Sequence, residues 1–279
     1  MRNFAFEVIT DMFEYDFFRN ALAGILIISI ASALIGTYIV TRRLVSISGG
    51  ITHACFGGLG LGYYLSVNPI FMAAIFAICS SLGVEWLSAR GRVREDSAIA
   101  VIWALGMAIG VLFVFLTPGY VPELNTFLFG NVLTISSYDL WTFAIFTIIL
   151  AAFFTWRYKQ IVACAFDSDF AKVINLPVRF INYTMTVFVA VCIVLTIRLV
   201  GIMLLMSMLA LPQMTAELFS NRFKNIMFIS IGVSAACSVG GLMLGTIIDV
   251  PCSALIVMVL VATYALASII KHLHYNLSH

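Results

Sequence analysis

One histidine, His53, lies in a long apolar stretch of this 279-residue chain. A neutral imidazole is the commonest ligand of transition metals in proteins, and an ionisable group in apolar surroundings is costly enough to be a candidate for function. A lone histidine in such a place also occurs simply as a packing residue. The sequence therefore offers His53 as a candidate metal ligand, with packing as the competing interpretation.

Small residues surround this histidine at helical spacing. Small side chains three and four residues apart let two helices approach closely in a membrane. The approach is either between two copies of the chain along a symmetry axis, which would leave a path beside the imidazole, or between helices of one subunit. The small residues are Gly50, Ala54, Gly57, Gly58 and Gly62.

The other polar groups in apolar stretches have structural interpretations. Glu85 lies one helical turn from Arg90, Arg92 and Arg94, and we expect its side chain to extend toward that cluster. The six cysteines are scattered without a CxxC pair. They indicate small buried apolar residues rather than a disulfide framework or a zinc site.

The elements that carry these residues are long apolar stretches. Hydrophobic residues make up 62% of the chain and charged residues 10%, which is too little polar surface for a soluble domain of this size. A helix needs about 20 apolar residues to cross the hydrocarbon layer. The sequence predicts an all-α polytopic membrane protein with about nine transmembrane helices, at Asn20–Val40, Ile51–Ser66, Pro69–Trp86, Ser97–Leu116, Tyr138–Trp156, Phe180–Ile197, Val200–Glu217, Ile226–Ile248 and Cys252–Ile270.

Basic residues gather on one side of this nine-span arrangement. Short loops rich in Lys and Arg stay in the cytoplasm, and the opposite loops, 118–137 and 249–251, contain neither. We therefore predict the N-terminus outside and the C-terminus in the cytoplasm. The residues on the predicted cytoplasmic side are Arg42, Arg43, Arg90, Arg92, Arg94, Arg157, Lys159, Lys172, Arg179, Arg222, Lys224 and Lys271.

Three parts of the chain differ in composition. Residues 1–19 mix acidic residues with phenylalanines and lack the features of a cleavable signal peptide. They predict an amphipathic segment in the membrane interface, with a flexible leader as the alternative. Residues 20–270 form the predicted transmembrane domain, and residues 271–279 a cytoplasmic tail whose three histidines indicate a solvated terminus rather than a metal site.

Motifs for phosphate-driven or hydrolytic catalysis are missing from the sequence. It contains no Walker loop, no kinase-like lysine set, no nucleophile elbow and no HExxH motif. We therefore expect a chain that is not an enzyme. Active transport through it would draw on an ion gradient or on a separate ATPase.

Several blocks, in order along the chain, resemble the permease subunits of ABC importers for manganese, zinc and iron, the metal-ion ABC-3 family. The resemblance extends from about Asn20 to Ser268, and it implies the permease fold of type II ABC importers. The matching blocks are Ala21–Ile25, Arg42–Arg43, Thr52–Ala54, Arg94–Ala100, Phe127–Thr134, Val200–Gly201 and Ala210–Ala216.

This resemblance implies a non-catalytic subunit in the bacterial cytoplasmic (inner) membrane. Two copies would form a homodimer whose translocation path carries a divalent transition metal ion. Each copy would dock on one cytoplasmic ATPase subunit, and an extracytoplasmic metal-binding protein would deliver the ion. Membrane lipid is a further partner, and neither nucleic acid nor a covalently bound cofactor is expected.

Two segments are implied to couple and gate transport. The predicted cytoplasmic connection 158–179 resembles the family's ATPase-coupling segment, a short amphipathic helix in which Asn replaces the usual Gly at a left-handed cap. The outer segment 123–136 resembles the short helix that closes the outer vestibule, with a loop on the headgroups as the alternative. The coupling residues are Asp167, Asp169, Ala171, Asn175 and Pro177, and the gate residues are Phe127, Phe129, Gly130 and Asn131.

At the implied metal site the chain departs from the family. The family typically carries an Asp one helical turn before the histidine, and Gly49 stands at that position. The implied ligands are then His53 with hydroxyl or backbone oxygens of Thr52 and Ser48. Three outcomes stay open: a softer or more weakly held ion such as iron or zinc, a chelate as the cargo, or a wet path without a binding site.

Other functional classes remain as alternatives. A permease for a metal chelate, siderophore or vitamin shares the type II architecture but commonly has one more span. A secondary metal transporter would need charged groups in the membrane to bind coupling ions. Such groups are few in these spans, so an importer of a divalent metal ion is the favoured interpretation. A membrane enzyme is the least favoured class, because no set of His, Asp and Glu residues converges on one face.

Overall fold

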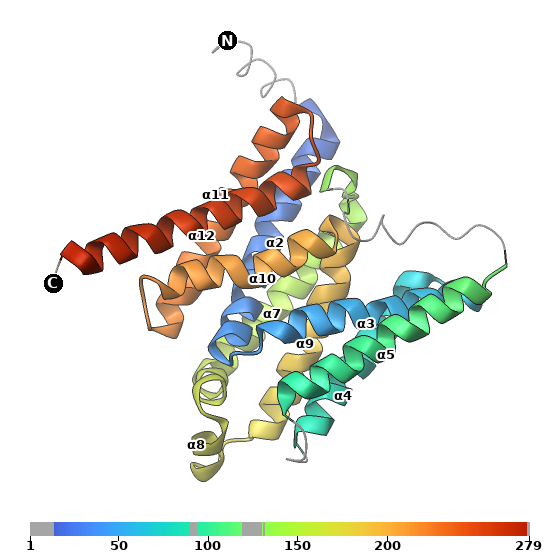
Figure 1. Cartoon of the computed structure of the whole chain (residues 1–279), viewed down its shortest axis with the longest axis horizontal. Coiled ribbons are helices and arrows are strands. Elements are labelled where there is room, and N and C mark those ends of the chain that lie inside the picture. The colour runs from blue at the N-terminus through green and yellow to red at the C-terminus, as the bar shows by residue number, and fades with distance from the viewer. Residues whose placement is uncertain (1–13, 90–93, 119–129, 131, 278–279) are drawn as a thin grey trace. The chain divides into compact units, whose positions relative to one another are not determined.

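The computed structural model describes residues 14–89, 94–118, 130 and 132–277. Within these ranges every regular element is helical (Figure 1). The elements are α2 (Asp16–Thr41), α3 (Val45–Tyr64), α4 (Pro69–Ala89), α5 (Glu95–Leu116), the 3-10 turn η1 (Val132–Thr134), α7 (Ser137–Phe166), α8 (Ser168–Val173), α9 (Val178–Val200), α10 (Ile202–Glu217), α11 (Phe223–Ile248) and α12 (Cys252–Leu277).

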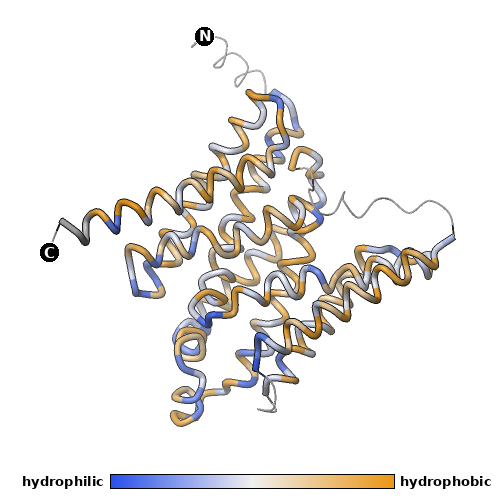
Figure 2. Tube along the Cα trace, in the orientation of Figure 1, coloured by the Kyte–Doolittle hydropathy of each residue, from blue (hydrophilic) through white to orange (hydrophobic). Residues whose placement is uncertain are grey.

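Most of these helices suit a bilayer. In the described part of the chain, seven are long and apolar enough to cross a membrane, namely α2, α4, α5, α7, α9, α11 and α12. The two remaining predicted spans fall on α3 and on α10, an apolar helix of 16 residues. Figure 2 shows hydrophobic residues along the length of the helices. The predicted all-α multi-pass architecture is confirmed.

Several helix boundaries differ from the prediction, among them the end of α7, which continues beyond Trp156 to Phe166 through a kink at Arg157. Helix α3 begins at Val45, six residues before Ile51, because α2 ends in a left-handed turn at Arg43 (φ 59°) that lets a new helix begin at once. The break between the sixth and seventh spans lies at Gly201 (φ 82°) rather than at residues 198–199, since glycine adopts a positive φ at little cost. Helix α12 continues to Leu277, through most of the predicted tail.

Two compact units make up the chain. One comprises Met1–Thr37, Phe127–Ala152 and Leu199–His279, and the other comprises Tyr38–Thr126 and Phe153–Arg198. In the first unit α10, α11 and α12 pack against one another, and Gly241 of α11 lies so close to α12 that a Cβ there would be 2.6 Å from the Cα of Ile256.

In the second unit α3, α4 and α5 lie side by side, so close that their backbones contact one another (Figure 1). A Cβ on Gly106 would be 2.5 Å from the Cα of Ala54, and a Cβ on Gly58 would be 2.6 Å from the Cα of Ala73. The helices can approach this closely because glycine has no side chain at the points of contact. The small residues near His53 pack tightly within one subunit, which was one of the two interpretations of their spacing.

Candidate functional site

His53 lies near the middle of α3, and its side chain is half-buried. The imidazole stacks on the indole of Trp103 from α5, with ring centroids 4.8 Å apart and planes inclined by 5°. Its Nδ1 atom is enclosed and has no hydrogen-bond partner. The ring is therefore held by stacking rather than by a polar contact.

The other residues implied at the metal site do not converge with the imidazole. Thr52 is fully buried and its hydroxyl has no partner, whereas the hydroxyl of Ser48 donates to the carbonyl oxygen of Val45 at 2.8 Å. Residues four apart share a helix face, so these two hydroxyls lie about 100° around α3 from the face shared by Gly49 and His53.

One chain supplies a single nitrogen donor at this place. Within the ranges that the structure describes, no group of three or more His, Cys, Asp and Glu side chains is placed to hold a metal ion. Transition metals in proteins commonly take four or more ligands. The imidazole by itself would therefore bind a metal ion weakly. Weak binding suits a translocation path better than a site that retains its ion.

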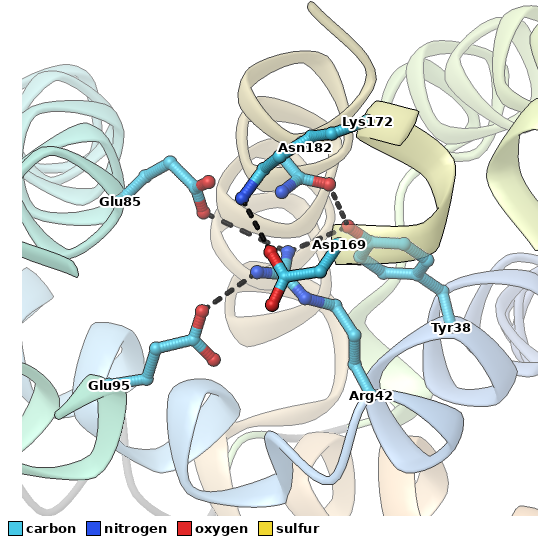
Figure 3. Close-up of polar contacts among 7 residues, drawn as sticks. All are labelled: Tyr38, Arg42, Glu85, Glu95, Asp169, Lys172 and Asn182. Atoms are coloured by element: carbon cyan, nitrogen blue, oxygen red, sulfur yellow. Dashed lines mark hydrogen bonds and ion pairs between the residues drawn. The ribbon is translucent and has the colours of Figure 1, made fainter. Parts of the chain in front are cut away.

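A polar cluster that the sequence did not reveal lies in the second unit (Figure 3). Arg42, just after α2, extends Nη2 to within 2.9 Å of Glu95 Oε1 and Nη1 to within 3.8 Å of Glu85 Oε2. Its Nη1 also donates to the hydroxyl of Tyr38 at 2.8 Å, and that hydroxyl lies 3.4 Å from Asn182 Oδ1. The Arg42 side chain is 8% exposed and that of Glu85 12%, so this is a buried ion-pair network.

Glu85 lies beside Arg42, a residue that the sequence did not suggest as its partner. The predicted direction of its side chain is toward Arg90, Arg92 and Arg94, and of these Arg90 and Arg92 lie outside the described part of the chain. The sharp turn after α2 brings Arg42 beside the end of α4. The only signal in the sequence was that Arg42 and Glu95 each belong to a block shared with the family.

The short helix predicted in the connection 158–179 is present as α8. Its N-cap is Asp167, whose carboxylate accepts hydrogen bonds from the backbone N–H groups of Asp169 and Phe170 at 3.0 and 2.9 Å. Asn175 follows the helix with φ 57°, the left-handed conformation that ends many helices. The local geometry thus follows from a capping Asp and a residue that tolerates positive φ.

The surface of α8 combines exposed apolar side chains with a charged pair. Phe170, Val173 and Ile174 are 59%, 78% and 48% exposed. Lys172 donates to Asp169 at 2.8 Å, a hydrogen bond that lowers the pKa of that carboxyl below its usual range, so the pair stays charged at neutral pH (Figure 3). Exposed apolar side chains on a short capped helix are typical of a docking surface.

Of the predicted outer-gate residues, only Gly130 is described, because Phe127, Phe129 and Asn131 lie outside the described residues. Gly130 has φ 54°, and its Cα lies against the backbone between α9 and α10. A Cβ there would be 2.6 Å from the carbonyl oxygen of Val200. Gly130 of the predicted gate segment therefore contacts a turn that depends on Gly201.

A buried glutamine lies in the first unit. Gln213 of α10 is fully buried, and its Nε2 donates to the carbonyl oxygens of Ser32 at 3.0 Å and Met208 at 3.3 Å. Pro212 has no N–H to pair with the Met208 carbonyl, so the Gln213 amide satisfies that group instead. The sequence showed this residue only within the block Ala210–Ala216.

Apolar helices of membrane-crossing length and few buried charges define a multi-pass membrane protein. The chain belongs to the ABC 3 transport family, whose model matches residues 14–271. It is 36% identical to a Chlamydia pneumoniae protein named "Probable metal transport system membrane protein", over 80% of this chain and 78% of that one. It is 29% identical to the manganese transport system membrane protein MntC of Listeria monocytogenes, over 90% of this chain and 89% of the relative.

A solved structure shares the fold. PsaBC from Streptococcus pneumoniae, in complex with Fab, contains a chain that superposes with a TM-score of 0.80 and covers 94% of each chain at 24% identity.

Proposed function

We propose that this chain is the non-catalytic, membrane-spanning permease subunit of an ATP-driven importer for a divalent transition metal ion. The observation that carries the proposal is a family match across residues 14–271 in a chain whose α3 holds one imidazole and no other charged or titratable nitrogen. Relatives that span most of the chain are named for metal or manganese transport, which supports a metal as the cargo.

A homodimer is the arrangement that the ligand count supports. One chain brings one imidazole to the path, and a two-fold axis would bring a second. Two neutral nitrogen donors with oxygen atoms of the path would hold an ion loosely enough to release it. The second copy of the chain is therefore a proposed partner.

The cytoplasmic partner is proposed to be an ATPase subunit that docks on α8. The exposed Phe170, Val173 and Ile174 offer an apolar surface, and the caps at Asp167 and Asn175 hold the helix in one conformation. A rigid docked helix can transmit closure of the ATPase to the membrane helices. The proposal places α8 and the C-terminus in the cytoplasm and the N-terminus outside, in the bacterial inner membrane.

On the outer side we place an extracytoplasmic metal-binding protein and the gate segment around Gly130. Apolar gate residues can exclude water until the docked binding protein displaces them. The contact between Gly130 and the α9–α10 turn supports a link between this segment and α10.

The test is metal accumulation in a host that lacks its own importers. The host expresses the chain with its ATPase and binding protein, as wild type, His53→Ala, Gly49→Asp and the matched histidine control His272→Ala. An ATPase partner that cannot hydrolyse ATP gives the background. We expect ATP-dependent uptake of a metal ion that falls with His53→Ala and is unchanged with His272→Ala.

Gly49→Asp tests what a carboxylate at position 49 would do to metal uptake. A rise in uptake or a change of preferred ion would show that position 49 faces the path. No uptake of any free ion, with the ATPase still stimulated by a metal chelate, would overturn the proposal in favour of a chelate permease. Uptake by the purified chain alone, driven by a proton gradient, would make it a secondary transporter.

A further inference from the structure

The imidazole of His53 stacks with two aromatic rings. The indole of Trp103 is parallel to it at 4.8 Å between centroids, and Phe56, on α3 itself, stacks at 6.0 Å with an inclination of 22°. Aromatic contacts of this kind have preferred geometries and stabilise one relative orientation. The plane of the imidazole is therefore set by aromatic neighbours, one of which comes from a different helix.

The distance between His53 and Trp103 is fixed by the backbone of their helices. Gly106 of α5 lies against Ala54 of α3, where a Cβ would be 2.5 Å from the Ala54 Cα. Ala54 directly follows His53 in α3, and Gly106 lies about one turn after Trp103 in α5. The stack is consequently part of a rigid helix pair.

Stacking takes the place of a hydrogen bond that metal-binding histidines usually have. Such a histidine commonly donates its second ring N–H to a carboxylate or carbonyl, which fixes the orientation of the ring. Nδ1 of His53 is enclosed without any such partner. The stack with Trp103 restrains the ring from outside α3.

Carboxylates are missing along this part of the two helices. Helix α3 contains no Asp, Glu, Lys or Arg, and α5 contains none after Asp96 in its first turn. Imidazole ligands suit iron, nickel, copper and zinc, whereas carboxylate, carbonyl and water oxygens suit manganese and magnesium. An imidazole without a carboxylate nearby therefore favours the first group.

We propose that Trp103 is the positioning residue that orients His53 toward the transported ion, and that this carboxylate-free pair prefers nitrogen-liganded ions such as Zn(II) and Fe(II) over Mn(II). The inference rests on the proposed function and adds the class of ion and a residue that determines it.

The first experiment measures selectivity in the complete complex. Uptake of labelled zinc and manganese, supplied together, is compared for wild type, Trp103→Phe, Trp103→Leu and the control Trp141→Leu, which changes an exposed tryptophan of α7. Loss of an orienting neighbour typically lowers metal affinity about 10–100-fold. We expect the zinc-to-manganese ratio to fall about tenfold in Trp103→Leu, less in Trp103→Phe, and not in Trp141→Leu.

A second experiment detects the ion at the stack without transport. The chain has four tryptophans, so replacing Trp86, Trp141 and Trp156 by Phe leaves Trp103 as the only fluorescent indole. We expect Co(II) to quench it saturably in the purified full-length chain, Zn(II) to relieve the quenching, and Mn(II) to have little effect. His53→Ala in the same background should abolish saturation.

The outcomes separate the two proposals. A wild-type ratio in folded Trp103→Leu, or no saturable quenching of Trp103, overturns the role of Trp103 and leaves metal import standing. A preference of wild type for manganese overturns the ion class. If wild type takes up no metal ion at all, the proposed function fails and this inference fails with it.

Discussion

The guanidinium of Arg42 lies 2.9 Å from the carboxylate of Glu95, although 53 residues separate them in the chain. Four positions after Arg42, the hydroxyl of Ser46 lies 3.0 Å from the carboxylate of Asp96. These two contacts tie the turn between α2 and α3 to the start of α5. Since α3 and α5 carry His53 and Trp103, the polar cluster anchors one end of the helix pair that holds the candidate site.

Replacing Arg42 by Met should strongly destabilise the protein. The substitution leaves Glu85 buried, at 12% side-chain exposure, without its positive partner. Removing one member of a buried ion pair costs about 3–5 kcal/mol. We expect a large fall in the melting temperature of the purified chain in detergent, measured with a thiol-reactive or scattering readout.

Two further variants distinguish the cost of leaving a buried charge unpaired from the cost of losing one ion-pair contact. Glu95→Gln should cost about 1 kcal/mol or less, because the Glu95 side chain is 38% exposed and water can replace its partner. The double variant Arg42→Met with Glu85→Met should recover part of the stability lost by Arg42→Met alone. Equal melting temperatures for Arg42→Met and Glu95→Gln would contradict a buried network.

Gly36→Ala should disturb the buried amide of Gln213. A Cβ on Gly36 would be 2.6 Å from both the Gln213 Cδ and the Leu209 carbonyl oxygen. The amide cannot withdraw without losing its bond to Ser32. Overpacking of this kind costs about 1–3 kcal/mol, and a melting curve of the purified chain would measure it.

The matched control is Gly240→Ala in α11, since a Cβ there would have nothing within 4 Å in the chain. Alanine is the better helix former by about 0.5–1 kcal/mol, so this variant should melt at or slightly above wild type. If both alanine variants melt alike, the amide of Gln213 is not confined as described.

Local signals in the sequence were enough to predict most of the fold. Apolar runs located nine helices, and the left-handed cap at Asn175 followed from a residue type that tolerates positive φ. The start of α3 was placed too late because Ser46, Ser48 and Gly49 resemble a loop. In the structure the hydroxyl of Ser48 donates to the carbonyl of Val45, within the helix.

The contacts around the candidate site could not be read from the sequence in the same way. Pairing of Arg42 with Glu95, or of His53 with Trp103, depends on how three helices pack, and no local spacing encodes it. The glycines that allow this packing were visible, but their partners were not. A residue type can indicate what a group is able to bind, whereas tertiary contacts decide what it faces.

Gly130→Ala should impair both stability and transport. Gly130 has φ 54°, which strains a residue with a Cβ, and the added atom would lie 2.6 Å from the Val200 carbonyl oxygen. A strained backbone position typically costs about 1–3 kcal/mol. We expect a lower melting temperature and reduced metal uptake, whereas Gly232→Ala, with nothing within 4 Å, should leave both unchanged. Wild-type uptake by Gly130→Ala would show that this turn does not take part in gating.

Substitutions of Asn175 test the coupling role of α8, because glycine and valine differ in how well they tolerate the positive φ at this position. At φ 57° glycine is unstrained, whereas a β-branched residue is disfavoured by about 1–2 kcal/mol. Asn175→Gly should therefore keep α8 and its coupling intact. Asn175→Val should unwind the end of the helix, reduce stimulation of the ATPase by the loaded binding protein, and lower uptake with little change in the amount of chain in the membrane.

The control for the valine substitution is Asn225→Val, an exposed asparagine in the first turn of α11 with right-handed backbone. It makes the same chemical change without the left-handed conformation, so ATPase stimulation should stay at the wild-type level. Coupling that survives Asn175→Val as well as Asn225→Val would mean that the shape of α8 does not matter to the ATPase. Coupling lost with Asn175→Val and kept with Asn175→Gly would tie it to the left-handed cap, since glycine removes the asparagine side chain but keeps the backbone conformation.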